Sequence, residues 1–361
     1  MVGTMRRTFF ALAGALAIVS AACGGTATSS PSPATSSAAK PSATATPKPP
    51  ADNVTLLTDF LLFGWHSPLF AGKAEGFYTE QNINVDIQAG KGSADGATKV
   101  AAGAAQFGQL DATSALTAIG KGADLVLIGA YFKKYPGGMC YIQEKHPIKT
   151  YKDMEGLKIG AAAGDAYMVA LPSLLQQAGS SMSKVQVVTL DASATTPALV
   201  SGQVDGTPCG LPTYPSRAAA AAQQGLHMSY FLFGDNGFDA LGFVLVTSGK
   251  LAKENPDLVQ RFTNAWAKSA VWSLANQDKA VGDFLAANPD KDKTSETASF
   301  TGVVPLIKGS ASTYFVFDAP QVQKTVDFVN QAYQVTLKPA DVYTNQFADK
   351  LPDAYKQGKL Q

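Results

Sequence analysis

A chain of 361 residues is long enough to form two lobes of ordinary size, or one large α/β unit, around a substantial core. Its 29 Lys plus Arg nearly balance its 28 Asp plus Glu, which argues against a nucleic-acid binder because such proteins carry a strongly basic face. With 46% hydrophobic and 16% charged residues, the composition also excludes collagen, disorder throughout the chain and a multi-span membrane protein.

The N-terminal segment has the pattern of an export signal. Arg6 and Arg7 precede the apolar run 9–19, and small residues then lead directly to Cys23. The apolar run is shorter than the ~20 residues that a transmembrane helix needs. A cysteine after small residues resembles the bacterial lipobox, so residues 1–23 are predicted to be a lipoprotein export signal with Cys23 as the lipidation site. A plain cleaved signal is the alternative, and the paired arginines also resemble a twin-arginine motif, so Sec and Tat export both stay open.

Residues 24–51 consist almost wholly of Ser, Thr, Pro, Ala and Gly. Such a segment cannot bury enough apolar surface to offset the entropy of ordering it, so a disordered linker is predicted. A lipid at Cys23 and this linker would hold a folded domain loosely at a membrane surface.

From residue 52 the chain alternates short β-rich runs with helical patterns. Repeated strand–helix units predict parallel sheets that are covered on both faces. A largely helical region follows the last strand, with helix starts at Asn255–Pro256 and Asp318. The predicted strands are 54–57, 85–87, 106–109, 125–130, 157–160, 185–190, 204–208, 229–233 and 243–246, and helices are predicted between most of them.

Sequence signatures of common enzymes are absent. The chain has no Walker A string, no serine nucleophile elbow and no His-Glu-x-x-His motif. The three histidines, His66, His146 and His227, are widely separated, which argues against a tetrahedral zinc site. The glycine loop 90–96 comes nearest to a dinucleotide fingerprint, but its third glycine is one place late, which favours a tight turn before a helix. The sequence therefore predicts no enzyme, no cofactor and no metal.

Two cysteines remain once Cys23 is assigned to lipid. Cys140 and Cys209 could form a disulfide in an oxidising compartment, or could pack separately as small hydrophobic residues. The distance between the two cysteines in the folded protein decides whether they are bonded, and the sequence does not give that distance, so both alternatives stay open.

Several short strings, in their order along the chain, resemble the solute-binding lipoproteins of ABC importers, in the nitrate/taurine-type group. The likeness covers about residues 54–349. Trp65-His66-Ser67-Pro68, after the first strand, is most similar to the thiamine-pyrimidine-synthase-like branch. The eukaryotic enzymes of that branch have a cysteine-rich iron-binding string that this chain lacks, which favours transport over catalysis. The matching strings are 69–78, 90–93, 99–103, 160–166, 202–205 and 254–259.

The resemblance implies an α/β, two-lobed periplasmic-binding-protein (type II) fold with parallel-rich sheets and a cleft between the lobes. The first lobe is expected at 52–140 plus 244–361 and the second at 141–243, with hinges near 139–142 and 243–246. The resemblance further implies an exported monomer, lipid-anchored at the outer face of the cytoplasmic membrane. Its expected partners are a small-molecule ligand and ABC permease subunits with a cytoplasmic ATPase, and no nucleic acid.

Ligands of open α/β sheets bind beyond the carboxyl ends of the strands, so the cleft loops are expected at 59–66, 90–95, 110–114, 162–167, 209–216 and 235–239. These cleft loops are rich in aromatic side chains and poor in arginine. Aromatic faces favour stacking on a flat ring, and only Arg217 is a candidate for clamping a strong anion. We therefore expect a small planar heteroaromatic ligand, either a pyrimidine precursor of thiamine or a flavin-like compound. A sulfonate or nitrate-like anion is the alternative in the same fold, and a pyrimidine-synthesis enzyme is the rival class.

Twelve residues on these loops are predicted to bind the ligand. The aromatic rings would stack on it, the aspartates would accept hydrogen bonds from ring amines, and His66 would donate to a ring nitrogen or carbonyl. For the rings and the histidine, packing in the interior is the alternative role, and for Asp111 and Asp165 it is helix capping. The set is Phe63, Trp65, His66, Ser93, Asp111, Thr113, Asp165, Tyr167, Cys209, Tyr214, Phe238 and Asp239.

Overall fold

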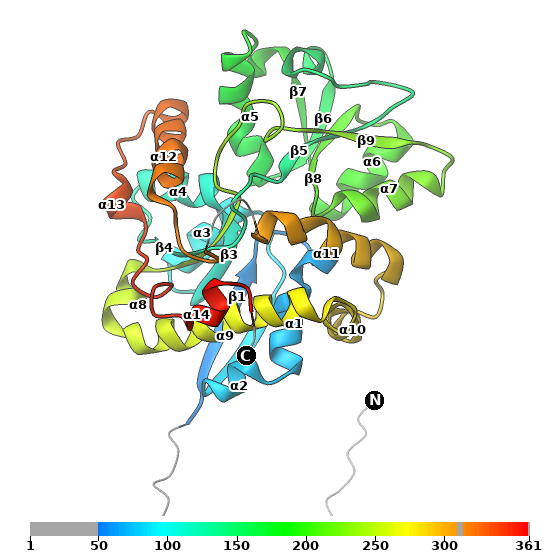
Figure 1. Ribbon diagram of the computed structural model, residues 1–361. Coiled ribbons are helices and arrows are strands. Elements are labelled where there is room, and N and C mark those ends of the chain that lie inside the picture. Colours follow the sequence, from blue (N-terminus) through cyan, green and yellow to red (C-terminus); the bar gives the residue numbers. More distant parts are fainter. Residues whose placement is uncertain (1–49, 309–312, 360–361) are drawn as a thin grey trace, which may run out of the picture. The chain divides into compact units, whose positions relative to one another are not determined.

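The computed structural model describes residues 50–308 and 313–359 (Figure 1). The predicted export signal with Cys23, and the linker up to residue 49, lie outside the described residues and stay predictions. The described part of the chain forms two five-stranded sheets, and the first of them includes a strand, β10, that is distant in sequence from the others.

The first sheet has the strand order β2-β1-β3-β10-β4. β1 runs parallel to both β2 and β3, whereas β10 comes from much later in the chain and pairs antiparallel with β3 and β4. The strands are β1 (Asp52–Thr58), β2 (Ile83–Gln88), β3 (Phe107–Asp111), β4 (Val126–Ala130) and β10 (Phe243–Thr247).

Helices cover both faces of this first sheet (Figure 1). Successive side chains of a strand point to opposite faces, so Phe243 and Leu245 of β10 pack with α1, α9, α10 and α11. Val244 and Val246 pack on the other face with α3, α4 and α12. These helices are α1 (Ser67–Ala74), α3 (Ser93–Ala101), α4 (Ala112–Gly120), α9 (Pro256–Ala275), α10 (Gln277–Ala287), α11 (Lys293–Lys308) and α12 (Ala319–Tyr333).

The second sheet repeats this plan, with the order β7-β6-β8-β5-β9. β6 is parallel to β7 and β8, and β5 is antiparallel to β8 and β9. α5 packs on one face, and α6 and α7 pack on the other. The elements are β5 (Gly137–Ile142), β6 (Lys158–Ala162), β7 (Gln186–Leu190), β8 (Gly206–Gly210), β9 (Met228–Leu232), α5 (Ala166–Gln177), α6 (Thr195–Ser201) and α7 (Tyr214–Ala222).

A disulfide joins β5 to β8 in the second sheet. Cys140 and Cys209 are bonded, with their Cα atoms 5.5 Å apart. Both are fully buried, beside Ala198 and Leu199 of α6. The structure thus decides between the two roles that the sequence left open for this pair.

The two-lobed α/β fold expected from the sequence is confirmed, and each sheet is mixed because β10 and β5 run against their neighbours. The chain passes from the first sheet to the second over residues 131–136 and returns over 233–242. The expected lobe boundaries, after residues 140 and 243, fall inside β5 and β10, and so do the expected hinges. These apolar runs are fully buried strands that pair on both sides, so the connecting segments lie just before them.

Short helices and turns complete the fold. Nowhere in residues 50–308 or 313–359 is a helix both long and apolar enough to cross a membrane. The remaining helices are α2 (Phe77–Glu80), α8 (Gly249–Glu254), α13 (Pro339–Val342) and α14 (Asp353–Lys356), and 3₁₀ turns occur at Gly64–His66, Tyr151–Met154, Met182–Lys184 and Ala192–Ala194.

Candidate functional site: a cavity between the two lobes

A small cavity, the cleft cavity, lies where strand ends and helix N-termini of the two lobes face each other, the usual place for a ligand in open α/β sheets. It measures about 20 Å³, which is room for about one water molecule. A larger ligand therefore requires the lobes to stand further apart than they do here. The lining residues are Asp59, Phe60, Gly92 and Ser93 of the first lobe, and Asp165, Ala166, Tyr167, Pro208, Thr213 and Arg217 of the second.

Two carboxylates cap helices next to the cavity, Asp111 fully buried and Asp165 partly buried. Oδ1 of Asp165 accepts a hydrogen bond from the backbone N–H of Tyr167 at 2.9 Å. Oδ1 of Asp111 accepts from the backbone N–H of Ser114 at 2.8 Å and from the hydroxyl of Thr113 at 2.6 Å. Burial raises the pKa of Asp165 to about 6 and that of Asp111 to about 7. Both residues are thus helix caps, and Asp165 also lines the cavity.

Asp59 lines the cavity directly after β1, with His66 behind it. Nε2 of His66 lies 3.1 Å from Oδ1 of Asp59, and Nδ1 lies 3.1 Å from the backbone nitrogen of Phe63. Nδ1 accepts from the backbone N–H of Phe63, which leaves Nε2 to donate to Asp59. Burial raises the pKa of Asp59, and the hydrogen bond from His66 opposes that rise. His66 is fully buried and does not line the cavity, so it orients the Asp59 carboxylate.

Arg217 is a buried, positively charged residue that lines the cleft cavity on the side of the second lobe. Arg217 is 5% exposed, and within the described part of the chain its guanidinium makes one hydrogen bond, a long one from Nη1 to the hydroxyl of Thr207 at 3.5 Å. Nε has no hydrogen-bond partner among the described residues. Burial lowers the pKa of Arg217, and the negative charge of Asp165 opposes that fall. A buried donor without a partner is costly, so this guanidinium is suited to pair with a ligand.

Glycines shape the cavity around the Tyr167 ring. A Cβ atom on Gly137 would lie 2.1 Å from this ring, so only glycine leaves space for it. Across the lobes, a Cβ on Gly92 would lie 2.5 Å from the carbonyl oxygen of Gly164. The loop before α3 and the loop before α5 therefore meet backbone to backbone.

Trp65 and Phe63, predicted to stack on the ligand, belong instead to the interior of the first lobe. Trp65 is 1% exposed, and its ring lies 5.3 Å from that of Phe132 and 5.0 Å from that of Phe243. Phe63 packs on the edge of the same core, under Nζ of Lys291. The 3₁₀ turn after Phe63 directs the indole toward the sheet rather than toward the second lobe.

Other predicted site residues also have partners away from the cavity. The Tyr214 hydroxyl donates to the carbonyl of Met228 at 3.0 Å on the outer side of the second sheet. Phe238 packs against Tyr135, and Asp239 pairs with Lys324 at the surface. Cys209 is in the disulfide, so it has no thiol to offer a ligand. Of the twelve predicted residues, the cleft cavity brings together Ser93, Asp165 and Tyr167.

Three lining residues, Asp59, Phe60 and Thr213, lie on the predicted cleft loops but were not among the twelve predicted ligand contacts. Asp59 and Phe60 directly follow β1, and Thr213 directly precedes α7. The rule that ligands bind at the carboxyl ends of strands points to such positions, whereas our prediction favoured the aromatic residues further along the loop.

A family described as "NMT1/THI5 like" matches residues 64–280. The chain is 24% identical over 271 residues to the riboflavin-binding protein RibY of Chloroflexus aurantiacus, covering 73% of this chain and 75% of that protein. It is 23% identical over 155 residues to the 4-amino-5-hydroxymethyl-2-methylpyrimidine phosphate synthase of Schizosaccharomyces pombe, covering 43% of this chain and 44% of the synthase.

Among solved structures, the alkanesulfonate-binding protein SsuA of Xanthomonas axonopodis pv. citri, bound to MOPS, superposes with a TM-score of 0.65. The two share 14% sequence identity, and the match covers 82% of this chain and 99% of that protein. This similarity identifies the periplasmic-binding-protein type II fold. The family match spans more than half of the sequence, so the chain belongs to the NMT1/THI5-like family.

Proposed function

We propose that this protein is the extracytoplasmic substrate-binding lipoprotein of an ABC importer. In this proposal it captures a small planar heteroaromatic compound, a pyrimidine precursor of thiamine or a flavin-like molecule, between its lobes. Closure of the lobes, rather than a chemical reaction, then presents the loaded protein to the permease. Family membership and the names of RibY and of the pyrimidine phosphate synthase support this class of ligand.

The observation that carries the proposal is the mixture of donors and acceptors in the cleft cavity. Asp59 presents a carboxylate from the first lobe, while Asp165 and Arg217 present a carboxylate and a guanidinium from the second. The edge of an aminopyrimidine or a flavin ring carries both N–H donors and N or O acceptors, so it can pair with all three. The rings of Phe60 and Tyr167 add flat apolar surface for the faces of such a ligand.

An anion of the sulfonate or nitrate kind is a second candidate, and Arg217 is the observation that favours it. Its buried guanidinium has no carboxylate in an ion pair among the described residues, and one structural neighbour is an alkanesulfonate-binding protein. Two carboxylates that line the same cavity, Asp59 from the first lobe and Asp165 from the second, oppose this candidate, because they would repel an anion at low dielectric. We therefore rank the heterocycle first.

Catalysis is not part of the proposal. An enzyme that uses pyridoxal phosphate would need a lysine at the site to form a Schiff base. Among the described residues, no lysine lines the cleft cavity. A purified protein with an absorbance band of such a cofactor would contradict the binding function.

We also propose that lipid on Cys23 anchors the protein at the outer face of the cytoplasmic membrane, and that the protein acts as a monomer. The sequence before the folded domain supports the anchor, as described above. Replacing Cys23 with Ser should release the protein from the membrane fraction of cells, because no lipid can then be attached.

A ligand panel tests the proposed function. The full-length protein is titrated with an aminopyrimidine, riboflavin, taurine and nitrate while its thermal unfolding is followed. A heterocycle should raise the melting temperature, because a ligand that binds only the folded state stabilises it. Arg217→Gln should weaken heterocycle binding by about tenfold, the loss of one charged hydrogen bond. If only the anions stabilise the protein, and Arg217→Gln abolishes their effect, the second candidate is correct.

A further inference from the structure

One helix of the first lobe contacts elements on both sides of the cleft cavity. α11 packs against the 3₁₀ turn Gly64–His66 of the first lobe and against α7 of the second (Figure 1). His66 in that turn bonds to Asp59, and α7 carries Arg217. α11 therefore lies beside the two segments that position charged groups of the cavity, one from each lobe.

On the first-lobe side, two side chains of α11 bind the 3₁₀ turn. Glu296 and Ser299 are three residues apart, so they lie on the same face of the helix. A carboxylate oxygen of Glu296 accepts from the backbone N–H of Gly64, and the hydroxyl of Ser299 accepts from the N–H of Trp65 at 3.2 Å. A Cβ on Gly64 would lie 1.9 Å from the carbonyl oxygen of Glu296, so this close approach requires glycine.

On the second-lobe side, the same Ser299 hydroxyl donates to the backbone carbonyl of Pro212. The next residue, Thr213, lines the cleft cavity, and its carbonyl accepts from the N–H of Arg217 at 3.3 Å in the first turn of α7. The position of Pro212 therefore affects where Thr213 and Arg217 meet the cavity. Ser299 and Pro212 are both buried, so bulk water does not compete for the bond between them.

This bond has no counterpart elsewhere between the lobes. Apart from the connecting segments 131–136 and 233–242, it is the one hydrogen bond between the two lobes that the structure describes within residues 50–308 and 313–359. Where the loops before α3 and α5 meet, the contact of Gly92 with Gly164 is backbone against backbone without a hydrogen bond.

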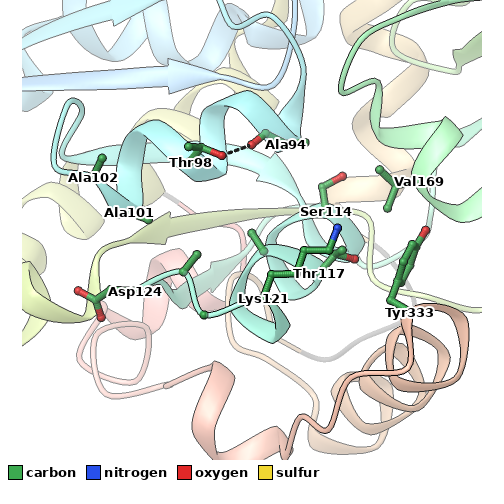
Figure 2. A pocket seen from close by; sticks show the side chains of 13 residues that line it. Ala94, Thr98, Ala101, Ala102, Ser114, Thr117, Lys121, Asp124, Val169 and Tyr333 are labelled. Carbon is green, nitrogen blue, oxygen red and sulfur yellow. Dashed lines mark hydrogen bonds between the residues drawn. The ribbon is translucent and has the colours of Figure 1, made fainter.

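The α4 side of the lobes is more open. A groove of about 740 Å³ runs between α3 and α4, and at one end of it Val169 of α5 lies near Ser114 and Tyr333 of the first lobe (Figure 2). The side chain of valine can neither donate nor accept a hydrogen bond. Directional contact between the lobes is therefore concentrated at Ser299.

We propose that Ser299 is a positioning residue of the ligand site, whose hydroxyl holds the loop before Arg217 against the turn behind Asp59 when the lobes close. This inference rests on the proposed function, since it presumes a ligand between the lobes. A serine hydroxyl has one proton and two lone pairs, so it can accept from Trp65 and donate to Pro212 at once. Because α11 packs in the core of the first lobe, opening of the lobes moves Pro212 away and breaks that second bond.

A bond that exists only in the closed protein acts on ligand release rather than on ligand entry. In Ser299→Ala the buried carbonyl of Pro212 has no partner after closure. The ligand should then dissociate about five to ten times faster than from wild type. The association rate constant should change by less than about twofold, because entry precedes the formation of the bond.

Stopped-flow mixing of the full-length protein with riboflavin or with an aminopyrimidine, followed by protein fluorescence, measures both rate constants. Ser269→Ala is the matched control. Ser269 is also a fully buried serine on a first-lobe helix, but its hydroxyl donates to the carbonyl of Ala265 within α9. This control should leave both rate constants unchanged.

X-ray scattering of the ligand-free, full-length protein tests the same bond without a ligand. Ser299→Ala should have a larger radius of gyration than wild type and Ser269→Ala, because the lobes lose the hydrogen bond between them. A substitution that only loosened the interior of one lobe would instead lower the urea concentration at the unfolding midpoint and leave the radius of gyration unchanged.

The outcomes separate the two proposals. A radius of gyration in Ser299→Ala equal to that of wild type, or an unchanged dissociation rate constant, overturns the positioning role of Ser299 and leaves the proposed function standing. An effect confined to the association rate constant has the same meaning. If Ser299→Ala has the larger radius of gyration but no heterocycle binds the wild-type protein, the proposed function is wrong and the connection of the lobes through Ser299 is retained.

Discussion

Two effects act in opposite directions on the pKa of Asp111: burial raises it, and the hydrogen bonds that the carboxylate accepts lower it. As the cap of α4 it accepts two hydrogen bonds through Oδ1, while Oδ2 is buried without a described partner. Burial raises its pKa to about 7, and the nearby charge of Asp59 raises it further. The residue is thus a carboxyl group that holds its proton in the folded protein at a pH where an unfolded chain has lost it.

This shift predicts how stability depends on pH. A carboxyl whose pKa is raised on folding contributes stability at low pH that is lost as the pH rises through its folded value. From about pH 4 to about pH 7 the loss approaches roughly 4 kcal/mol, because each pH unit corresponds to about 1.4 kcal/mol. Asp111→Asn keeps a good helix cap but cannot ionise, so the variant should gain stability relative to wild type as the pH rises.

Urea unfolding of both proteins at several pH values from 4 to about 8 measures this difference. Asp239→Asn, at an exposed ion pair with Lys324, is the control for losing one carboxylate. A constant difference between Asp111→Asn and wild type over the whole range would contradict the ionisation of Asp111 as the cause.

At the scale of single elements, the disulfide ties β5 to β8 across 69 residues of sequence. Closing a loop of that length lowers the entropy of the unfolded chain, and simple chain models give about 4 kcal/mol. The doubly substituted variant Cys140→Ala, Cys209→Ala should therefore unfold at a lower urea concentration than the oxidised wild type. Under reducing conditions strong enough to keep the unfolded thiols apart, the two proteins should become similar. Equal stability without reductant would show that the bond contributes nothing net.

The elements themselves were largely predictable from the sequence. Short β-rich runs placed β1, β2, β3 and β10 within a few residues of their observed bounds, and Asn255 caps α9 through Oδ1, which accepts from the N–H of Leu258. β5 was missed as a strand of the second sheet, because its apolar run was assigned to a hinge. Local patterns specify which segments pair, but they do not reveal between which sheets the chain crosses.

The site was less predictable, for a physical reason. Trp65 and Tyr167 are both large rings near the start of a helix, and both are less than one-tenth exposed. One packs under the first sheet and the other lines the cleft, and the difference depends on a 3₁₀ turn at 64–66 and on Gly137. Contacts between segments that are far apart in sequence cannot be read from a local pattern. Asp59 and Arg217 were not among the predicted ligand contacts because their surroundings form only when the two lobes meet.

At the scale of the whole folded domain, function depends on how the lobes approach each other. Ser299 of α11 connects them, since its hydroxyl accepts from the backbone N–H of Trp65 and donates to the carbonyl of Pro212. On the other side of the cleft cavity, the contact between Gly92 and Gly164 has no side chain in it. The absence of a side chain lets two helix N-termini come together around a ligand, so that backbone N–H groups and buried charges act on it at short range.

Gly92→Ala should therefore hold the lobes apart. The new Cβ would meet the carbonyl oxygen of Gly164 at 2.5 Å, so the two loops could not reach their present separation.

Gly103→Ala is the matched control. Gly103 also has a positive φ, of 76° against 132° for Gly92, but a Cβ on Gly103 would have no neighbour within 4 Å. Both variants should lose about 1 kcal/mol or more of stability through backbone strain. Only Gly92→Ala should show a larger radius of gyration in X-ray scattering of the full-length protein, and only it should bind the ligand of the panel more weakly. If both variants scatter alike and bind alike, the meeting of these two loops does not limit closure, and the close fit of the lobes has to come from the α7–α11 side instead.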